Sequence, residues 1–353
     1  MRRFLIVLLA VLAVLAGADT LLWRRGTQQL AAGFAAWAEA ARADGWTVDG
    51  GPPSAAGWPF AAELEVPRLA LTGGLADGLP VPLAWRSDRL RLHVDLLHAR
   101  RLLLLPEGRQ RLRLGAGAEI PLAADRLQVA VPLDAGATPG VADLAGTNLR
   151  IGMPGSEATL TVALLAGHGE WRKGASPAGS TFDFALTAEE IAVPMRPSAL
   201  GSRVAAFSAQ GTLKGPLPPQ PDLAARAAAW RDAGGTLELR SLALGWGPLG
   251  LMGNATLGLD GQLQPTGSAT LQVRGQNEAL EALAAAHVIR PTAARAAAAV
   301  LGLLARPPEG GGTPDVEVPL TLRDRTLSFG LMPLAKVPEL LWPGPIQPAT
   351  LTP

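Results

Sequence analysis

The sequence predicts a mainly β protein with a few helices. We expect an N-terminal transmembrane helix, then a curved antiparallel sheet with a barrel-like or groove-like shape, and a helical hairpin near the C-terminal end. Three observations lead to this fold class: an apolar run opens the chain, apolar and polar residues alternate through most of the remainder, and alanine-rich segments interrupt the alternation near its end. Alternation with a period of two is typical of strands that cover a core on one face only.

The first element is an apolar run that follows Met1-Arg2-Arg3 and extends from Phe4 to Trp23, interrupted only by Asp19 and Thr20. About 20 apolar residues are needed to cross the hydrocarbon core of a bilayer. The sequence therefore predicts a membrane anchor, and its candidate bilayer-facing residues are Phe4, Leu8, Leu12, Leu15 and Trp23.

The same run has a second interpretation, because Ala16-Gly17-Ala18 fits the cleavage site of a signal peptide. Apolar residues continue at helical spacing through Phe34 to Ala41, and Gly45 is a natural helix stop. This favours one uncleaved helix over residues 1–43. The expected location is the bacterial inner membrane, with a single pass and the bulk of the chain in the periplasm. Secretion to the periplasm after cleavage near Ala18 is the alternative.

Residues 44–214 form a first predicted β region and residues 215–353 a second, and we expect them to make one continuous β body. Strand-like alternation recurs at segments such as Asp88–Leu97 and Val316–Leu322. The apolar phase shifts across Pro67 and again at Arg240-Ser241. Shifts of this kind predict bulges or bends, which curve a sheet.

Helices are expected at residues 221–232 and in a hairpin over residues 277–305. Asn277 is a candidate cap for the first hairpin helix, and Pro291 suits the start of the second. The hairpin is inserted between Val273 and Val316, so it lies between two strands. We expect it to cover one end or one open face of the sheet.

Composition excludes several classes of chemistry. The absence of cysteine excludes disulfides, thiolate zinc sites and cysteine nucleophiles. A net charge of +1 gives no overall electrostatic footprint for nucleic acid. Hydrophobic residues make up 48% of the chain, which excludes intrinsic disorder. We expect no cofactor, no metal and no nucleic-acid partner, and no catalytic residue is assigned.

Two motifs resemble catalytic or nucleotide-binding patterns. Gly245–Gly250 matches G-x-G-x-x-G, but strand-like sequence follows it, so a tight bend between strands is expected. His168-Gly169-Glu170 lies among glycines and reads as an exposed loop. A hydrolase would need His168 to converge with Ser156 or Asp183, and this is the least favoured function.

An arginine cluster offers candidate contacts to anionic lipid or to a membrane surface at Arg89, Arg91, Arg111 and Arg113. Because these residues alternate with apolar ones, the solvated face of a sheet is the default interpretation.

Several segments carry a resemblance to a known family: Gly57-Trp58-Pro59-Phe60, the segment from Trp85 to Leu92, Leu259-Asp260-Gly261, and Val318-Pro319-Leu320 after the alanine-rich helices. Together they resemble the proteobacterial family that carries domain of unknown function 2125. The resemblance implies a bacterial, membrane-associated envelope protein and transfers no catalytic residue. A looser architectural similarity exists to AsmA-like envelope proteins, which pair one anchor with a long β structure that shields lipid.

The predicted function is a membrane-anchored, periplasmic, non-enzymatic envelope protein that binds or shields lipid on an apolar β face. Its expected partners are the membrane and either lipid or another envelope protein. A scaffold or assembly factor without a ligand cavity is the alternative.

Overall fold

The computed structural model describes residues 2–73, 83–115, 117–133, 140–172, 179–194, 199–217, 223–287, 289–306, 315–330, 332–340 and 342. Strands account for more than half of the residues that the structure describes, which confirms the mainly β prediction. The helices are α1 (Arg2–Ala43), α2 (Leu223–Asp232), α3 (Gln276–Ala285) and α4 (Pro291–Leu304). The strands are β1 (Thr47–Asp49), β2 (Ser54–Ala56), β3 (Ala61–Gly73), β4 (Leu83–Asp95), β5 (Arg101–Leu114), β6 (Ile120–Ala123), β7 (Arg126–Pro132), β8 (Val141–Gly152), β9 (Thr159–Trp171), β10 (Ser180–Ala192), β11 (Arg203–Lys214), β12 (Thr236–Trp246), β13 (Leu249–Leu259), β14 (Pro265–Arg274), β15 (Ala305–Arg306), β16 (Asp315–Arg323), β17 (Thr326–Phe329) and β18 (Met332–Lys336).

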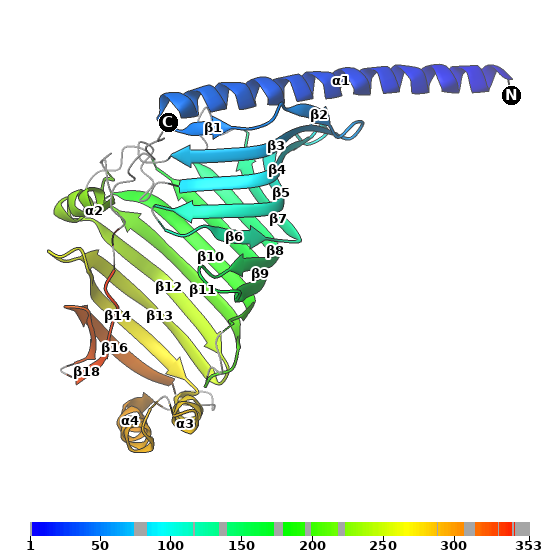
Figure 1. Cartoon of the computed structure of the whole chain (residues 1–353). Helices are drawn as coiled ribbons and strands as arrows, with labels where there is room; N and C mark the ends of the chain where they lie inside the picture. The colour runs from blue at the N-terminus through cyan, green and yellow to red at the C-terminus, as the bar shows by residue number, and fades with distance from the viewer. Residues whose placement is uncertain are drawn as a thin grey trace.

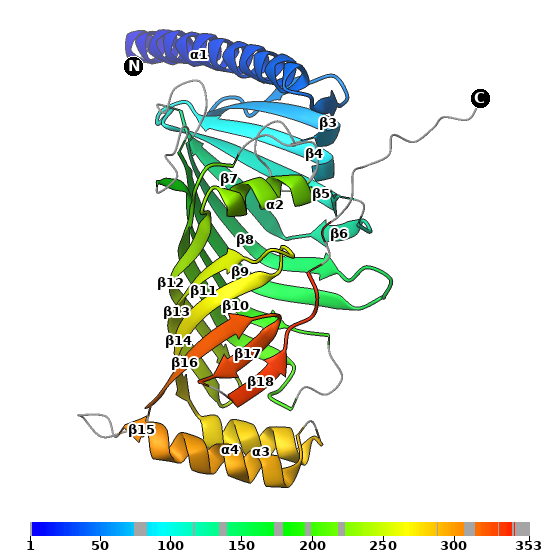
Figure 2. The same ribbon diagram turned by 90° about the vertical axis from the view of Figure 1, so that its left-hand side faces the viewer.

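All the strands belong to one antiparallel sheet with an up-and-down order. β3, β4 and β5 pair in sequence, β6 and β7 both bridge β5 to β8, and β8 to β14 then pair one after another. β14 pairs with β16, and β17 and β18 follow. The pairing of β11 with β12 crosses the boundary predicted at residue 214, so the two β regions form one body. The sheet bends strongly along its length (Figure 1, Figure 2).

The predicted phase shift at Arg240 is a bulge in the structure, whereas the one at Pro67 is a local bend without a register shift between β3 and β4. Arg68, which follows Pro67, has a left-handed backbone with φ 50°, and its neighbours Pro67 and Leu69 pair with β4 in unchanged register. Arg240 is skipped between β11 and β12, where Gln210 pairs with Ser241 and Gly211 pairs with Leu239. An extra residue of this kind bends its strand and increases the local twist. The apolar residues thereby stay on one face through the bend.

Helix α1 is continuous to Ala43 and ends near Gly45, which has φ 87°. Its C-terminal half packs on the sheet, and its N-terminal half extends beyond the sheet edge (Figure 1). Within the part of the chain that the structure describes, no helix combines the length and the apolar character needed to cross a membrane. Of the predicted anchor residues, the side chains of Phe4, Leu8 and Leu15 lie outside the described residues, whereas Leu12 is exposed and Trp23 is half-buried.

The predicted helical hairpin is present as α3 and α4, at the end of the sheet opposite α1 (Figure 2). The cap prediction is wrong: the N-cap of α3 is Gly275 with φ 65°, and Asn277 lies inside the first turn. A Cβ at position 275 would lie 1.9 Å from the carbonyl oxygen of Pro248, so only glycine fits this turn.

Candidate functional site

One face of the sheet, here called the inner face, is the face on which α1 packs. Strand register aligns a row of apolar or glycine residues on this face from β3 to β16. The row contains Leu64, Leu92, Leu104, Val129, Leu144, Gly167, Leu186, Ala209, Leu242, Gly253, Leu271 and Val318.

Three further inner-face rows flank this one on β10 to β16, and they are equally apolar. They contain Ala188, Phe207, Leu244, Leu251, Val273 and Val316; Phe184, Gly211, Leu239, Ala255, Ala269 and Leu320; and Phe182, Leu213, Leu237, Leu257, Gly267 and Leu322. No charged side chain occurs in these four rows. From Leu251 to Leu257 they extend about 20 Å along β13, at about 3.4 Å per residue.

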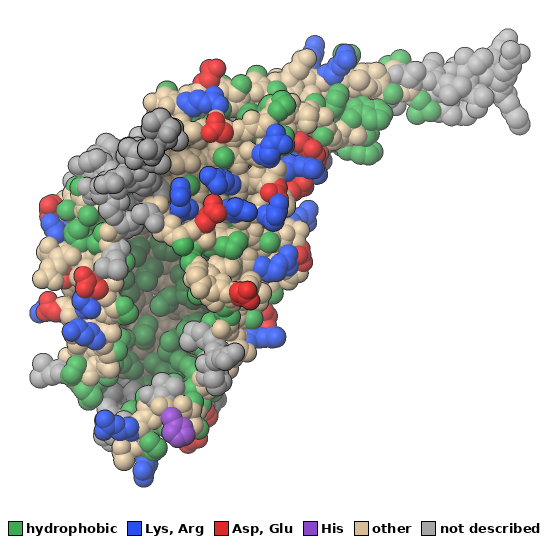
Figure 3. All heavy atoms as spheres, viewed as in Figure 1, with side chains coloured by type: hydrophobic (Ala, Val, Ile, Leu, Met, Phe, Trp, Pro, Cys, Tyr) green, Lys and Arg blue, Asp and Glu red, His purple; other side chains and the backbone are tan. Residues whose placement is uncertain are grey.

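The two ends of the inner face are covered, but its middle is not. Under α1, Leu64 is 2% exposed and packs in a buried cluster with Ala38, Ala41 and Leu92. At the far end, Val316, Val318 and Leu320 form another buried cluster. In between, β12, β13 and β14 contribute no fully buried side chain. Figure 3 shows a hollow there, lined by hydrophobic side chains.

Glycines shape the part of the inner face next to this hollow, on β9 to β11. The ring centroids of Trp171 and Phe182 are 5.5 Å apart, and those of Phe182 and Phe184 are 6.1 Å apart. A Cβ at Gly169 would lie 3.1 Å from the Phe182 ring, and one at Gly211 would lie 2.9 Å from the Phe184 ring. The rings therefore rest over glycine backbone, at positions where the Cβ of an alanine would push against them.

The opposite face, here called the outer face, carries the predicted arginine contacts. Arg89 and Arg91 form ion pairs with acidic neighbours on β3 and β5, which are Glu63, Glu65 and Glu107. Arg111 pairs with Glu119 at 3.4 Å. Arg113 is exposed and forms no ion pair with any described residue. The paired arginines fit the solvated face of a sheet, and Arg113 alone keeps an uncompensated charge.

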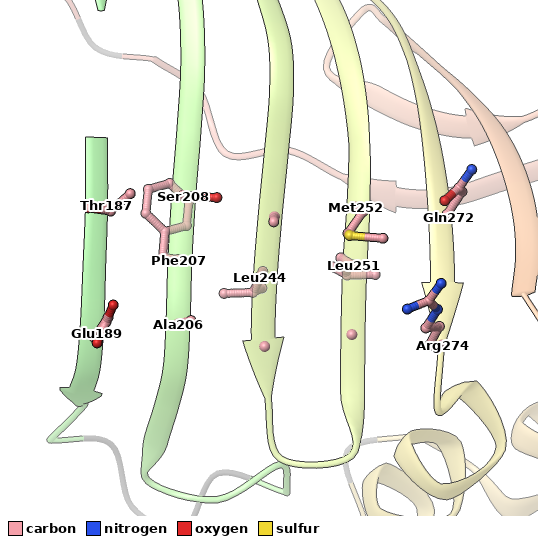
Figure 4. A pocket seen from close by; sticks show the side chains of 13 residues that line it. Thr187, Glu189, Ala206, Phe207, Ser208, Leu244, Leu251, Met252, Gln272 and Arg274 are labelled. Atoms are coloured by element: carbon pink, nitrogen blue, oxygen red, sulfur yellow. The ribbon is translucent and has the colours of Figure 1, made fainter. Parts of the chain in front are cut away.

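The outer face also holds a shallow trough of about 360 Å³ across β10 to β14 (Figure 4). Its floor is made of small residues that include Ala206, Ala243 and Gly250, and Glu189 and Arg274 lie at opposite sides. The described lining contains the hydroxyls of Thr187 and Ser208 but no histidine to activate them. Over the described ranges, no cluster of three potential metal ligands forms either.

The prediction of an exposed loop at His168 is wrong, because His168 lies within strand β9. Its Nδ1 is 2.7 Å from Oδ1 of Asp143 on the neighbouring strand. Asp183 instead accepts hydrogen bonds from the hydroxyls of Ser180 and Thr212, while Ser156 lies in the turn between β8 and β9. Neither candidate forms a hydrogen bond to His168, so the hydrolase constellation is not assembled.

The G-x-G-x-x-G segment is the predicted bend. β12 ends at Trp246, β13 begins at Leu249, and Gly247 between them has φ 56°. A Cβ at Gly247 would lie 2.4 Å from the carbonyl oxygen of Leu200. The glycine thus serves close packing of a turn, as expected for a strand-to-strand connection.

Sequence reasoning predicted an apolar face but did not identify which residues line the hollow. Alternation assigns residues to a face of one strand, whereas a row across many strands depends on register. The glycines at 169 and 211 are the signal that was missed, because glycine inside a strand often marks a close approach.

Comparison with known proteins gives one match. The family model described as an uncharacterized protein conserved in bacteria (DUF2125) matches residues 23–338. No curated protein and no solved structure shows significant similarity to the chain. The match begins at Trp23, so the apolar run before it lies outside the matched region.

Proposed function

We propose that this chain, which belongs to the DUF2125 family of uncharacterised bacterial proteins, is a membrane-anchored envelope protein whose inner face binds the acyl chains of lipids. The observation that carries the proposal is the uncovered apolar middle of this face on β12, β13 and β14. Contiguous apolar surface of this extent is costly to leave in water and is typical of a binding surface.

The chemistry of the rows favours an acyl chain over an extended peptide. The four rows consist of apolar side chains and glycine, and the backbone behind them is already paired within the sheet. A peptide strand laid across them would bury its own N–H and C=O groups without partners. An acyl chain has no polar group to satisfy. The four rows extend about 20 Å along β13. This length exceeds the thickness of the acyl-chain layer of one bilayer leaflet, which is roughly 15 Å, or half of the hydrocarbon core.

The N-terminal half of α1 is the proposed anchor. Residues 4–22 have an apolar sequence and continue as helix into the docked half. At 1.5 Å per residue they extend about 28 Å, close to the thickness of the hydrocarbon core. We place the anchor in the inner membrane and the sheet in the periplasm, as a short N-terminal end favours.

The test compares two neighbouring residues of β13 that face opposite ways. Leu251 lies on the inner face and Met252 on the outer face, where it is 42% exposed. Full-length wild-type protein, Leu251→Asp and Met252→Asp are purified gently from bacterial membranes. Native mass spectrometry then measures stoichiometric bound lipid, and circular dichroism checks the fold.

We expect lipid on the wild type and on Met252→Asp, and loss of lipid from a folded Leu251→Asp. Equal lipid on all three folded proteins would contradict inner-face binding. A folded wild type without lipid would favour a scaffold or assembly factor. The intact mass also shows whether residues 1–18 remain, and their absence would favour secretion after cleavage.

A further inference from the structure

A second apolar surface lies where α1 leaves the sheet. Trp23 Nε1 donates a hydrogen bond of 2.8 Å to the carbonyl oxygen of Ala56 on β2, and Gly26 packs against Ala62 and Leu96. These contacts fix the point of departure. Leu21 and Leu22, immediately before it, are exposed.

Two loops bring further apolar side chains to the same end of the sheet. Phe60 precedes Ala61, which pairs with Asp95, and Leu97 follows Asp95 by two residues. Phe60 is 82% exposed and Leu97 is 84% exposed, and Trp58 is also exposed. We call Leu21, Leu22, Trp58, Phe60 and Leu97 the exit rim. Figure 1 shows the loop between β2 and β3 beneath α1 at this point, and Figure 3 shows hydrophobic side chains gathered there.

Hydrogen bonds hold the backbone of both loops. The backbone N–H of Ala61 donates to the carbonyl oxygen of Gly57 at 3.0 Å, which closes the turn containing Trp58 and Phe60. The backbone N–H groups of Leu97 and His98 donate to Oδ1 of Asp95 at 2.8 and 3.2 Å. Both turns are therefore held by hydrogen bonds while they present large apolar side chains to solvent. This combination indicates a contact surface.

Positive charge surrounds the exit rim. Arg24 and Arg25 on α1, Arg100 in the loop before β5, and Arg101 at the start of β5 are exposed and form no ion pair with any described residue. The nearby acids are fewer: Asp19 is half-buried, and Asp95 is occupied by the backbone of its own turn. Elsewhere on β4 and β5, Arg89, Arg91, Arg109 and Arg111 are each paired with an acid.

We infer that the exit rim docks on the surface of an anionic lipid bilayer at the point where the span of α1 ends, and that Trp58, Phe60 and Leu97 add a membrane contact separate from that span. Its apolar side chains enter the boundary between headgroups and acyl chains, and the four arginines lie against lipid phosphates. Aromatic side chains next to arginines are typical of this layer of a membrane. The inference uses the α1 anchor of the proposed function for orientation and does not depend on lipid in the hollow.

The test uses the natural absence of cysteine, so a single introduced thiol labels one site. Full-length Phe60→Cys, Leu97→Cys, Leu12→Cys and Leu164→Cys proteins carry an environment-sensitive fluorophore and are reconstituted in phosphatidylcholine vesicles with or without phosphatidylglycerol. Leu164 is an exposed outer-face residue of β9 and serves as the matched control. Lipids spin-labelled near the headgroup quench a probe that lies in the membrane surface, and lipids labelled along the chain quench Leu12→Cys inside the bilayer.

We expect headgroup-labelled lipid to quench the probes at 60 and 97, more strongly with phosphatidylglycerol, and to leave the probe at 164 unquenched. Quenching at 12 without quenching at 60 and 97 would overturn the rim contact and keep the anchor. Quenching at 60 and 97 without quenching at 12 would keep the rim contact and reject the span. A spectral shift at 60 and 97 without lipid quenching would overturn the inference in favour of a protein partner.

The arginines are tested in the Phe60→Cys background. Arg100→Gln with Arg101→Gln should abolish the extra quenching that phosphatidylglycerol produces. Arg113→Gln with Arg126→Gln removes the same charge from exposed outer-face positions and should leave that extra quenching intact. An undiminished phosphatidylglycerol effect in the first pair would overturn selection for anionic lipid.

Discussion

The inner face under α1 and the inner face of β12 to β14 have the same kind of sequence and different surroundings. Leu64 and Leu92 are buried by a helix, whereas Leu242 and Leu251 belong to the same face and remain half-exposed. At the covered end, the apolar side chains of the sheet are buried because α1, from the same chain, packs on them. The open middle lacks such a partner among the described residues, and its missing cover is what the proposed lipid supplies.

The largest expected effect separates these regions by stability. Leu64→Ala removes a side chain that is 2% exposed, so we expect it to cost about 3 kcal/mol of unfolding free energy. Leu251→Ala should cost less than about 1 kcal/mol, because a half-exposed site gains little from burial. Denaturant unfolding of the detergent-solubilised, delipidated protein measures both values. Equal costs would mean that the middle is as well packed as the end.

A second comparison tests the docking of α1 with two glycines of one helix. A Cβ at Gly26 would lie 2.8 Å from the Cβ of Ala62, while Gly33 has no neighbour within 4 Å. We expect Gly26→Ala to lose about 1–2 kcal/mol through overpacking, and Gly33→Ala to gain up to about 1 kcal/mol through helix propensity. Hydrogen exchange of the amides of residues 23–43 reports the change. A stabilising Gly26→Ala would show that the helix is not tightly seated.

Acid should weaken the sheet at β10 to β12 through Asp183, which lies on the outer face of β10. The hydroxyl of Thr212 donates a hydrogen bond that holds the pKa of Asp183 below its ordinary value of 3.8, and the hydroxyl of Ser180 adds to this. The contribution to stability is therefore present above pH 3.8 and is lost as the pH falls through the folded-state pKa. We expect Asp183→Asn to flatten the pH dependence of protection in β10 to β12 amides. An unchanged acid profile in that variant would assign the effect to other carboxylates.

The smallest expected effect on stability concerns the ion pairs on the outer face of the strands that α1 covers. Arg89 lies 3.6 Å from Glu65 and 3.8 Å from Glu107, with its side chain about half-exposed. Exposed pairs of this kind contribute less than about 1 kcal/mol. Arg89→Gln should therefore shift thermal unfolding only slightly and leave vesicle binding unchanged. A marked loss of vesicle binding would restore the outer-face arginines as membrane contacts.

Local sequence patterns predict where the helices, strands and bends lie. They do not predict which side chains from distant segments meet on one surface of the folded chain. The helix ending before Gly45, the hairpin between Val273 and Val316, and the bulge at Arg240 all follow from local rules of backbone geometry. His168 was misplaced because glycine neighbours suggest a loop, whereas here Gly169 lies inside a strand to admit the Phe182 ring. The exit rim was missed because exposure of Phe60 and Leu97 depends on two loops that meet only in the folded chain.

The up-and-down order of the strands has a consequence for how the protein is made. From β8 to β14, each strand pairs with the strand that precedes it in the chain, so its partner is already present when it emerges. Such local contacts lower the loop-closure entropy of each step and favour fast, progressive folding. Docking of α1 on β3 and β4 completes a buried cluster from the first 92 residues. The growing sheet thus has a stable end from which later hairpins add in order.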